Sequence, residues 1–440
     1  MKVTVLYRIV IVFLFALFLV PDFCFARPEA AVKYSIKRAE NPHQEKEVLI
    51  LPYAFPSDSL GNMIGIGGMT KGYGQKQLLF GATAFASDDN AGGGIAGIWD
   101  YKPPWFNRIY LSCMLSSGHY PRMKAYTKVN RTGQENEAGG NDSDKNDYIE
   151  DPGRDTWFDF KLEYVLPIGS MKDKTYAEYH LKNGLLVKGA SGGDYWNPFE
   201  TGVTVMMIKQ FNRYQSYDTS SGVVEGTIHP VEIGILYDNT DFSVNPSKGS
   251  SQYIGITNDN GWLDSEQGWT FIEFEASKYF DLGETRHARQ QVLAFNFWTG
   301  DSLSYEIRSD SSGNDYVFKK PPFLEGARLG GFYRMRAYPI DRFNDRSVIY
   351  STMEYRYTPR WNPIADISLL KFLKMDWFQV VGYIEGGRVA NEYTVEKMFS
   401  NWKMDVGIGI RAMVAGGVVR FDVATSDEST TTWVMFGHPF

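Results

Sequence analysis

The sequence contains only two cysteines among its 440 residues. Cys24 lies in the first 26 residues, so a chain that loses this segment keeps Cys113 alone and forms no internal disulfide. After residue 26, no stretch approaches the roughly 18 apolar residues of a membrane-spanning helix. Basic residues are not in excess, and the formal net charge is −7. A negative net charge argues against nucleic-acid binding.

The first 26 residues have the pattern of a secretory signal peptide. Lys2 and Arg8 precede an apolar run over residues 9–20, and small residues suited to cleavage follow it. We therefore expect residues 1–26 to be removed before folding. A retained membrane anchor is the alternative, but no charged segment typical of a cytoplasmic flank follows the run.

Apolar and polar residues alternate over many segments of strand length. Within residues 404–412, Val406 and Ile408 alternate with Asp405 and Gly407, which gives a strand one apolar face and one polar face. The pattern does not tell which face is the interior. A soluble sandwich and a barrel surrounded by lipid both agree with it.

The C-terminal segment favours the barrel. Its apolar residues Val434, Phe436 and Phe440 alternate, and a final strand that ends in an aromatic residue is typical of the sorting signal of bacterial outer-membrane barrels. A bilayer offers no water to unpaired backbone groups, so only helices and closed barrels cross it. Together with the signal peptide, this predicts an all-β, transmembrane antiparallel β-barrel whose apolar faces contact lipid.

About sixteen segments have the length of tilted spanning strands, and an even number suits a single-chain bacterial barrel. They lie at 63–71, 76–87, 91–101, 108–118, 155–165, 175–188, 199–210, 228–239, 251–259, 269–280, 290–299, 347–358, 376–386, 402–413, 416–425 and 431–440.

This assignment divides the mature chain into a short periplasmic lead, residues 27–62, and a barrel, residues 63–440. Two connections are long. Strand order places the first, residues 118–154, on the periplasmic side, and the second covers residues 300–346.

The second long connection carries the most specific motif. Residues 329–338 read Leu-Gly-Gly-Phe-Tyr-Arg-Met-Arg-Ala-Tyr, and residues 353–359 read Met-Glu-Tyr-Arg-Tyr-Thr-Pro. These segments resemble the loop motif and following strand of the BamA-type outer-membrane assembly superfamily, also called the bacterial surface antigen family. Further matches follow in the family's order at residues 237–249, 383–389, 407–411 and 419–424, so that the resemblance covers residues 237–440.

The resemblance implies that residues 300–346 fold back into the lumen, where Arg336 pairs with Glu385. A guanidinium suits this role because its planar fork matches a carboxylate. The implied loop motif is Gly330, Gly331, Arg336 and Tyr338, and the implied inner-wall partners are Tyr383, Glu385 and Gly387. Without the resemblance, a solvated position of Arg336 in an outer loop is the simpler interpretation.

The sequence departs from the family pattern in several places. Ala337 replaces the usual glycine, Met335 replaces an aliphatic residue, and Glu385 stands where aspartate is common. Family members usually begin with periplasmic POTRA domains, for which residues 27–62 are too few. The chain therefore resembles a barrel-only member, with a periplasmic partner as one way to replace these domains.

The resemblance also implies a seam between the first and last strands, where the family's barrels open sideways to a client strand. Gly65, Gly67 and Gly68 interrupt the segment at 63–71, and glycine weakens a strand. The alternative is that these glycines only relieve barrel curvature.

No enzyme, metal or cofactor is expected. Residues 189–193 match the Gly-x-Ser-x-Gly motif of hydrolases, but that motif requires a following helix, which the sequence does not predict. The six histidines are scattered without metal-ligand spacing. Asp142, Asp144 and Asp147 resemble a calcium loop only loosely, and a solvated loop explains them better.

The function implied by the resemblance is insertion or transport of polypeptides at the outer membrane of a Gram-negative bacterium. The alternatives are a porin-like passive or selective solute channel and, after it, an outer-membrane structural or interaction protein with exposed loops. Expected partners are membrane lipid and lipopolysaccharide, the assembly machinery that reads the C-terminal strand, and a periplasmic protein.

Overall fold

The computed structural model describes residues 29–40, 46–57, 61–128, 132–219, 222–265, 267–322, 324–362 and 375–440. The predicted signal peptide, residues 1–26, lies outside these residues. Strands dominate the described part, whose helices are limited to η1 (Gly169–Met171) and α2 (Val395–Met398). Neither of these helices is long and apolar enough to cross a membrane.

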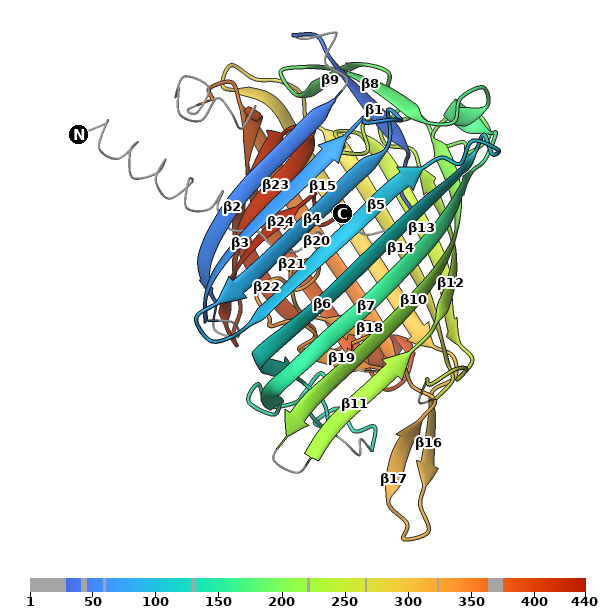
Figure 1. Cartoon of the computed structure of the whole chain (residues 1–440), viewed down its shortest axis with the longest axis vertical. Coiled ribbons are helices and arrows are strands. Elements are labelled where there is room, and N and C mark those ends of the chain that lie inside the picture. The colour runs from blue at the N-terminus through green and yellow to red at the C-terminus, as the bar shows by residue number, and fades with distance from the viewer. Residues whose placement is uncertain are drawn as a thin grey trace, which may run out of the picture.

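One antiparallel sheet closes into a barrel, shown in Figure 1. In the described residues sixteen wall strands each pair with the next wall strand along the chain. They are β2 (Glu47–Ser57), β3 (Gly61–Lys71), β4 (Leu79–Ser87), β5 (Gly92–Tyr101), β6 (Ile109–Ala125), β7 (Ile149–Val165), β10 (Val203–Thr219), β12 (Val231–Asp238), β13 (Gly249–Asp259), β14 (Trp269–Asp281), β15 (Ala288–Ser302), β20 (Ser347–Pro359), β21 (Met375–Ala390), β22 (Lys403–Val414), β23 (Gly417–Thr425) and β24 (Thr430–Phe436). In the closed order of the strands, β24 neighbours β3.

The two faces of the wall follow the alternation of the sequence. Ile64 of β3 and Ile408 of β22 point outwards and expose 67% and 68% of their surface. The alternate residues Glu273 and Glu275 of β14 point inwards and are 7% and 4% exposed. An apolar exterior around a polar interior is the arrangement that a bilayer requires of a barrel.

β10 is long enough to pair with two strands in succession. Its first half pairs with β12, and its second half pairs with β11 (Gly222–Ile228). The interruption falls at His229 and Pro230, where proline has no N–H to donate to a ladder.

The expected lead at residues 27–62 is wrong, because β2 lies within it and pairs with β3 along the full length of both strands. The segment 175–188 is not a wall strand either. Its place in the count is taken by β2, so the number sixteen holds for a different set of strands. Strand order then moves the first long connection, now residues 126–148, to the same end as the connection after β15.

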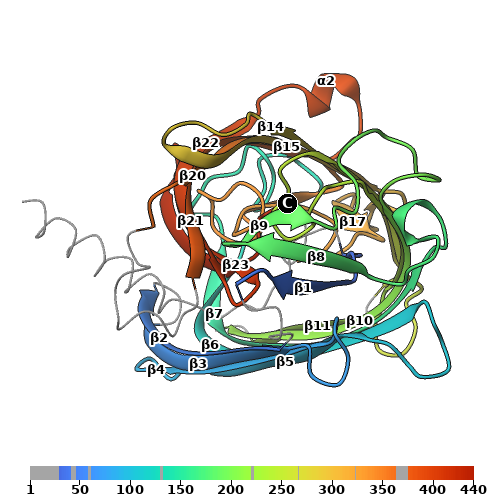
Figure 2. The ribbon, with the colours of Figure 1, turned by 90° about the horizontal axis from the view of Figure 1, so that it is seen from above.

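A small sheet covers the end of the barrel at which β2 begins, which we call the terminal end. In Figure 2 its strands cross the bore, in the order β1 (Tyr34–Arg38), β8 (Ala177–Lys182) and β9 (Leu185–Lys188). Its apolar side chains, including Tyr179 and Leu181, pack together with Val32, which precedes β1, against wall residues such as Val205 and Trp377. We call these three strands the mouth sheet.

The opposite end, which we call the loop end, carries the connection between β15 and β20. Its hairpin β16 (Glu306–Ser309) and β17 (Asp315–Phe318) projects away from the barrel in Figure 1. Its second part enters the lumen through a short ladder between β18 (Ala327–Leu329) and β19 (Phe343–Asp345). We call residues 327–345 the lumen loop.

Candidate functional site

The lumen loop turns sharply at its two glycines. Gly330 and Gly331 have φ values of 111° and 107°, which favour glycine. A Cβ on Gly330 would lie 2.1 Å from the carbonyl oxygen of Pro339. The amide of Gly331 donates to the carbonyl of Tyr338 at 3.0 Å, which closes the loop on itself. The tip is therefore a compact unit whose shape excludes a side chain at this turn.

Arg336 lies at the tip and is fully buried. Its guanidinium contacts three carboxylates from three wall strands: Glu354 of β20 at 3.0 Å, Glu385 of β21 at 3.2 Å and Asp422 of β23 at 2.9 Å. The structure thus brings Arg336 against Glu385, and it adds two acids that the sequence analysis did not assign. Both lie in the inward-facing positions of segments that carried the family resemblance, which is the signal that would have identified them.

The guanidinium also stacks on an aromatic ring. Its Cζ lies 3.4 Å from the ring centre of Tyr383, an arrangement that favours a cation. Tyr383 faces Gly407 across the β21–β22 ladder. The open space above Gly407 is what admits the ring, so two inward-facing residues of adjacent strands prepare the surface on which Arg336 rests.

Further arginines balance the acids around Arg336. Arg411 donates to both carboxylate oxygens of Glu354, at 2.6 and 2.9 Å, and Arg356 donates to Glu354 at 2.9 Å. Arg420 pairs with Asp422. All of these side chains are buried. Since removal of one member of a buried charge network costs about 3–5 kcal/mol, the lumen loop is held by a strong and mutually dependent set of contacts.

Backbone atoms of the tip are bound as well. The amide of Arg336 donates to Glu385 at 2.7 Å, and its carbonyl accepts from the indole of Trp433 at 2.7 Å and from the hydroxyl of Thr431. Trp433 and Thr431 belong to β24. The lumen loop is therefore tied directly to the last strand of the barrel.

Tyr338 and Gly387 complete the predicted set. Burial and the neighbouring Asp427 raise the pKa of the Tyr338 hydroxyl, which stays protonated and donates to Asp427 at 2.9 Å. Gly387 lies under Leu329 of the lumen loop, and a Cβ there would be 2.9 Å from the Leu329 Cδ1. Both residues keep the loop close to the wall.

The placement of Phe440 differs from the sequence-based prediction. Val434 and Phe436 lie on β24 opposite to its inward-facing residues, as an alternating strand requires, but β24 ends at Phe436. Gly437, with φ of 77°, turns the chain into the lumen. Phe440 is 8% exposed and its ring lies 6.2 Å from that of Tyr279. The prediction that Phe440 faces lipid is wrong for this reason.

Gly65, Gly67 and Gly68 lie on β3, which pairs with β2 and neighbours β24 in the closed order of the strands. The sideways opening of this seam stays a prediction. The ring of Tyr53 covers Gly65, where a Cβ would lie 2.2 Å from the Tyr53 Cζ. At this position glycine makes room for an aromatic neighbour.

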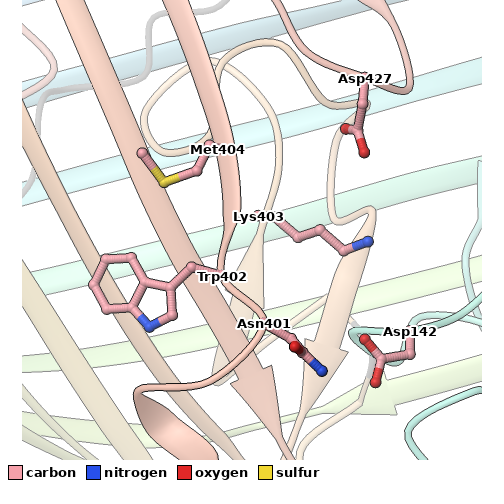
Figure 3. Close-up of a pocket in the computed structure, with 6 residues that line it drawn as sticks. All are labelled: Asp142, Asn401, Trp402, Lys403, Met404 and Asp427. Atoms are coloured by element: carbon pink, nitrogen blue, oxygen red, sulfur yellow. The ribbon is translucent and has the colours of Figure 1, made fainter.

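A pocket of about 450 Å³ lies at the loop end of the barrel. Figure 3 shows the side chains that line it. It is lined by Asp142, Asn401, Trp402, Lys403, Met404 and Asp427. Asp427 also receives the Tyr338 hydroxyl, so the pocket adjoins the lumen loop. The Gly-x-Ser-x-Gly segment lies elsewhere: Ser191 is 2% exposed and donates to the carbonyl of Thr240 at 3.0 Å near the terminal end.

Comparison with known proteins gives a family and a fold. The model of the Omp85 superfamily domain matches residues 160–433. No curated protein matches the chain. Among solved structures, the chain is similar to CdiB from Escherichia coli, with a TM-score of 0.52 and 10% identity over 88% of this chain and 61% of that chain.

Two further structures have lower scores. BamA from Haemophilus ducreyi lacking POTRA domains 1-3 has a TM-score of 0.47 and 10% identity, covering 90% of this chain and 71% of that chain. CdiB from Acinetobacter baumannii has a TM-score of 0.47 and 9% identity, covering 88% and 59%. The chain thus spans about three fifths of the length of the two CdiB chains.

Proposed function

The chain belongs to the Omp85 superfamily, and from this membership we propose that it assists the insertion or transport of polypeptides at the outer membrane of a Gram-negative bacterium. The role is non-enzymatic. In this proposal the terminal end faces the periplasm and the loop end faces the exterior, since outer-membrane barrels have the longer loops outside. Lipid and lipopolysaccharide surround the wall, and a periplasmic partner acts at the terminal end.

The observation that carries the proposal is the occupied bore. Arg336 anchors the lumen loop to three wall strands, and the mouth sheet covers the terminal end. A passive solute channel needs an open path, whereas a polypeptide-handling barrel benefits from a bore that stays closed between clients. The occupied bore therefore favours polypeptide handling over the porin-like alternative.

The last strand supports the same proposal. Trp433 and Thr431 bind the carbonyl of Arg336, so that movement of the lumen loop and movement of β24 are mechanically linked. A client strand that pairs at the edge of β24 would disturb these contacts. The loop and the last strand are thus suited to move together.

Depletion of the protein tests the proposal. Quantitative mass spectrometry of the outer membrane should show a selective loss of one or more surface polypeptides, which a plasmid copy of the wild type restores. A copy carrying Arg328→Ala should restore these polypeptides as well, because Arg328, within the described residues, pairs only with Asp341 of the same loop and does not hold the loop to the wall. An unchanged polypeptide content combined with slower uptake of small solutes would support the channel instead.

A further inference from the structure

β1 occupies the edge of the mouth sheet although it comes from a distant part of the chain. It pairs in parallel with β8, and Tyr34 lies opposite Ala177. Figure 2 shows β1 lying across the bore between β8 and the wall. Adding one extended segment to the edge of an existing sheet is a common mode of peptide recognition.

Side chains of β7 hold the main chain just before β1. Lys161 Nζ donates to the carbonyl of Glu29 at 2.6 Å, and the amide of Ala31 donates to Glu163 Oε1 at 3.0 Å. The ladder adds main-chain contacts, such as the amide of Ala177 donating to the carbonyl of Lys33 at 2.7 Å. Contacts to backbone atoms do not depend on the side chains of the bound segment, so another sequence can make them.

One side chain adds selectivity. Lys33 is 1% exposed, and its ammonium lies 2.5 Å from Glu163 Oε2 and 2.8 Å from Asp100 Oδ1. The neighbouring Val32 packs into the apolar cluster beneath the mouth sheet. The wall thus offers two carboxylates to one buried lysine, beside an apolar position.

We propose that the edge of β8, together with Lys161, Glu163 and Asp100, is a binding site for an extended polypeptide segment that carries a lysine after an apolar residue. Residues 29–38 of the chain occupy the site at rest. That the incoming segment belongs to a client polypeptide rests on the proposed function. That the β8 edge binds such a segment does not. An incoming lysine replaces Lys33, so the two carboxylates are never left unpaired in the exchanged state.

Peptide binding to the purified full chain in detergent tests this site. The probe is a fluorescent peptide with the sequence of residues 29–38, and its anisotropy is measured against the wild type and Lys33→Ala. The variant should bind the peptide at least about tenfold more tightly, because its own segment has lost a buried ion pair and competes poorly. A second peptide, with alanine at the position of Lys33, should bind the Lys33→Ala variant at least about tenfold more weakly than the first peptide does.

Lys37→Ala is the matched control. Lys37 lies on the same strand, but its ammonium pairs with the half-exposed Glu178 at 2.8 Å outside the buried site. This variant should bind the peptide as weakly as the wild type. Heat-dependent migration on gels verifies that each variant is a folded barrel, and Glu163→Gln, which keeps the shape of the wall, replaces Lys33→Ala if that variant does not fold.

Equal affinity of wild type and Lys33→Ala, or equal affinity for the lysine and alanine peptides, would overturn the proposed site. If Glu163→Gln is used, its preference for the lysine peptide should be smaller than that of the wild type, because only Asp100 is left to pair with the ammonium. An undiminished preference would overturn the proposal. Failure of the proposed function is distinguishable, because an unchanged outer-membrane content after depletion would contradict polypeptide handling and leave the peptide affinities unaffected.

Discussion

The ring of Tyr383 covers the backbone of Gly407, where a Cβ would lie 2.3 Å from the Tyr383 Cζ. The guanidinium of Arg336 stacks on the same ring. The absence of a side chain at Gly407 of β22 leaves room for the ring of Tyr383 on β21. This ring in turn supports Arg336 of the lumen loop.

Gly407→Ala should therefore weaken the attachment of the lumen loop, although residue 407 lies on β22 and not on the loop. The added methyl forces Tyr383 from its place, and overpacking of this kind costs about 1–3 kcal/mol. The temperature at which the barrel unfolds, followed by gel migration or circular dichroism, should fall. Gly382→Ala is the matched control, because no atom lies within 4 Å of a Cβ at Gly382, and it should leave that temperature unchanged. Equal behaviour of the two variants would contradict the prediction.

The tail after β24 should make stability depend on pH. His438 is buried between Arg411, whose guanidinium nitrogen lies 2.6 Å from its Nδ1, and Asn245. Burial first, and then the positive charges of Arg356 and Arg411, hold the pKa of His438 well below its usual 6.5. The ring is neutral in the folded chain and accepts a hydrogen bond from Arg411.

The direction in which folding stability changes with pH follows from proton binding at His438. The unfolded chain takes up a proton at His438 near pH 6.5 and the folded chain does not, so folding stability is unaffected above that pH and decreases below it. The other charged groups that face the ring are Arg420 and Glu354. The unfolding temperature of the wild type should fall between pH 7.5 and 5.0, and His438→Gln should remove part of this fall. An identical pH dependence in both proteins would refute the assignment.

Conductance in planar bilayers should reflect the two closures of the bore. The wild type should give small, fluctuating currents, because the lumen loop and the mouth sheet each obstruct the path. Arg336→Ala and Lys33→Ala should each increase the current only slightly, since one obstruction remains. The double variant should exceed the sum of the single effects. A large, steady current from the wild type would instead identify an open channel.

The wall of the barrel was predictable from sequence because lipid imposes alternation on every spanning strand. The same alternation gave a wrong prediction at residues 175–188. There β8 and β9 bury their apolar face against the inside of the wall, and periodicity cannot distinguish a strand of the mouth sheet from a strand of the wall. β2 was missed because Pro52 and Pro56 interrupt its pattern.

The candidate site was predictable only in part. The contact between Arg336 and Glu385 followed from the family resemblance, but the network around it depends on which inward positions meet across strands. Glu354 and Asp422 reach Arg336 from β20 and β23, on either side of the β21–β22 pair. Phe440 was misplaced because the alternation gives no sign of the inward turn at Gly437.

Arg336 seats the lumen loop against the wall of the barrel, and cysteine labelling measures this seating directly. Ala337 is fully buried beside Arg336, so a cysteine at this position, in a chain whose Cys24 and Cys113 are replaced by serine, should resist a water-soluble maleimide.

Adding Arg336→Ala should increase the labelling rate at least about tenfold, because three buried carboxylates lose their shared partner and release the loop. Adding Arg328→Ala should leave the rate unchanged. Fast labelling with Arg336 intact, or slow labelling after its removal, would contradict the account.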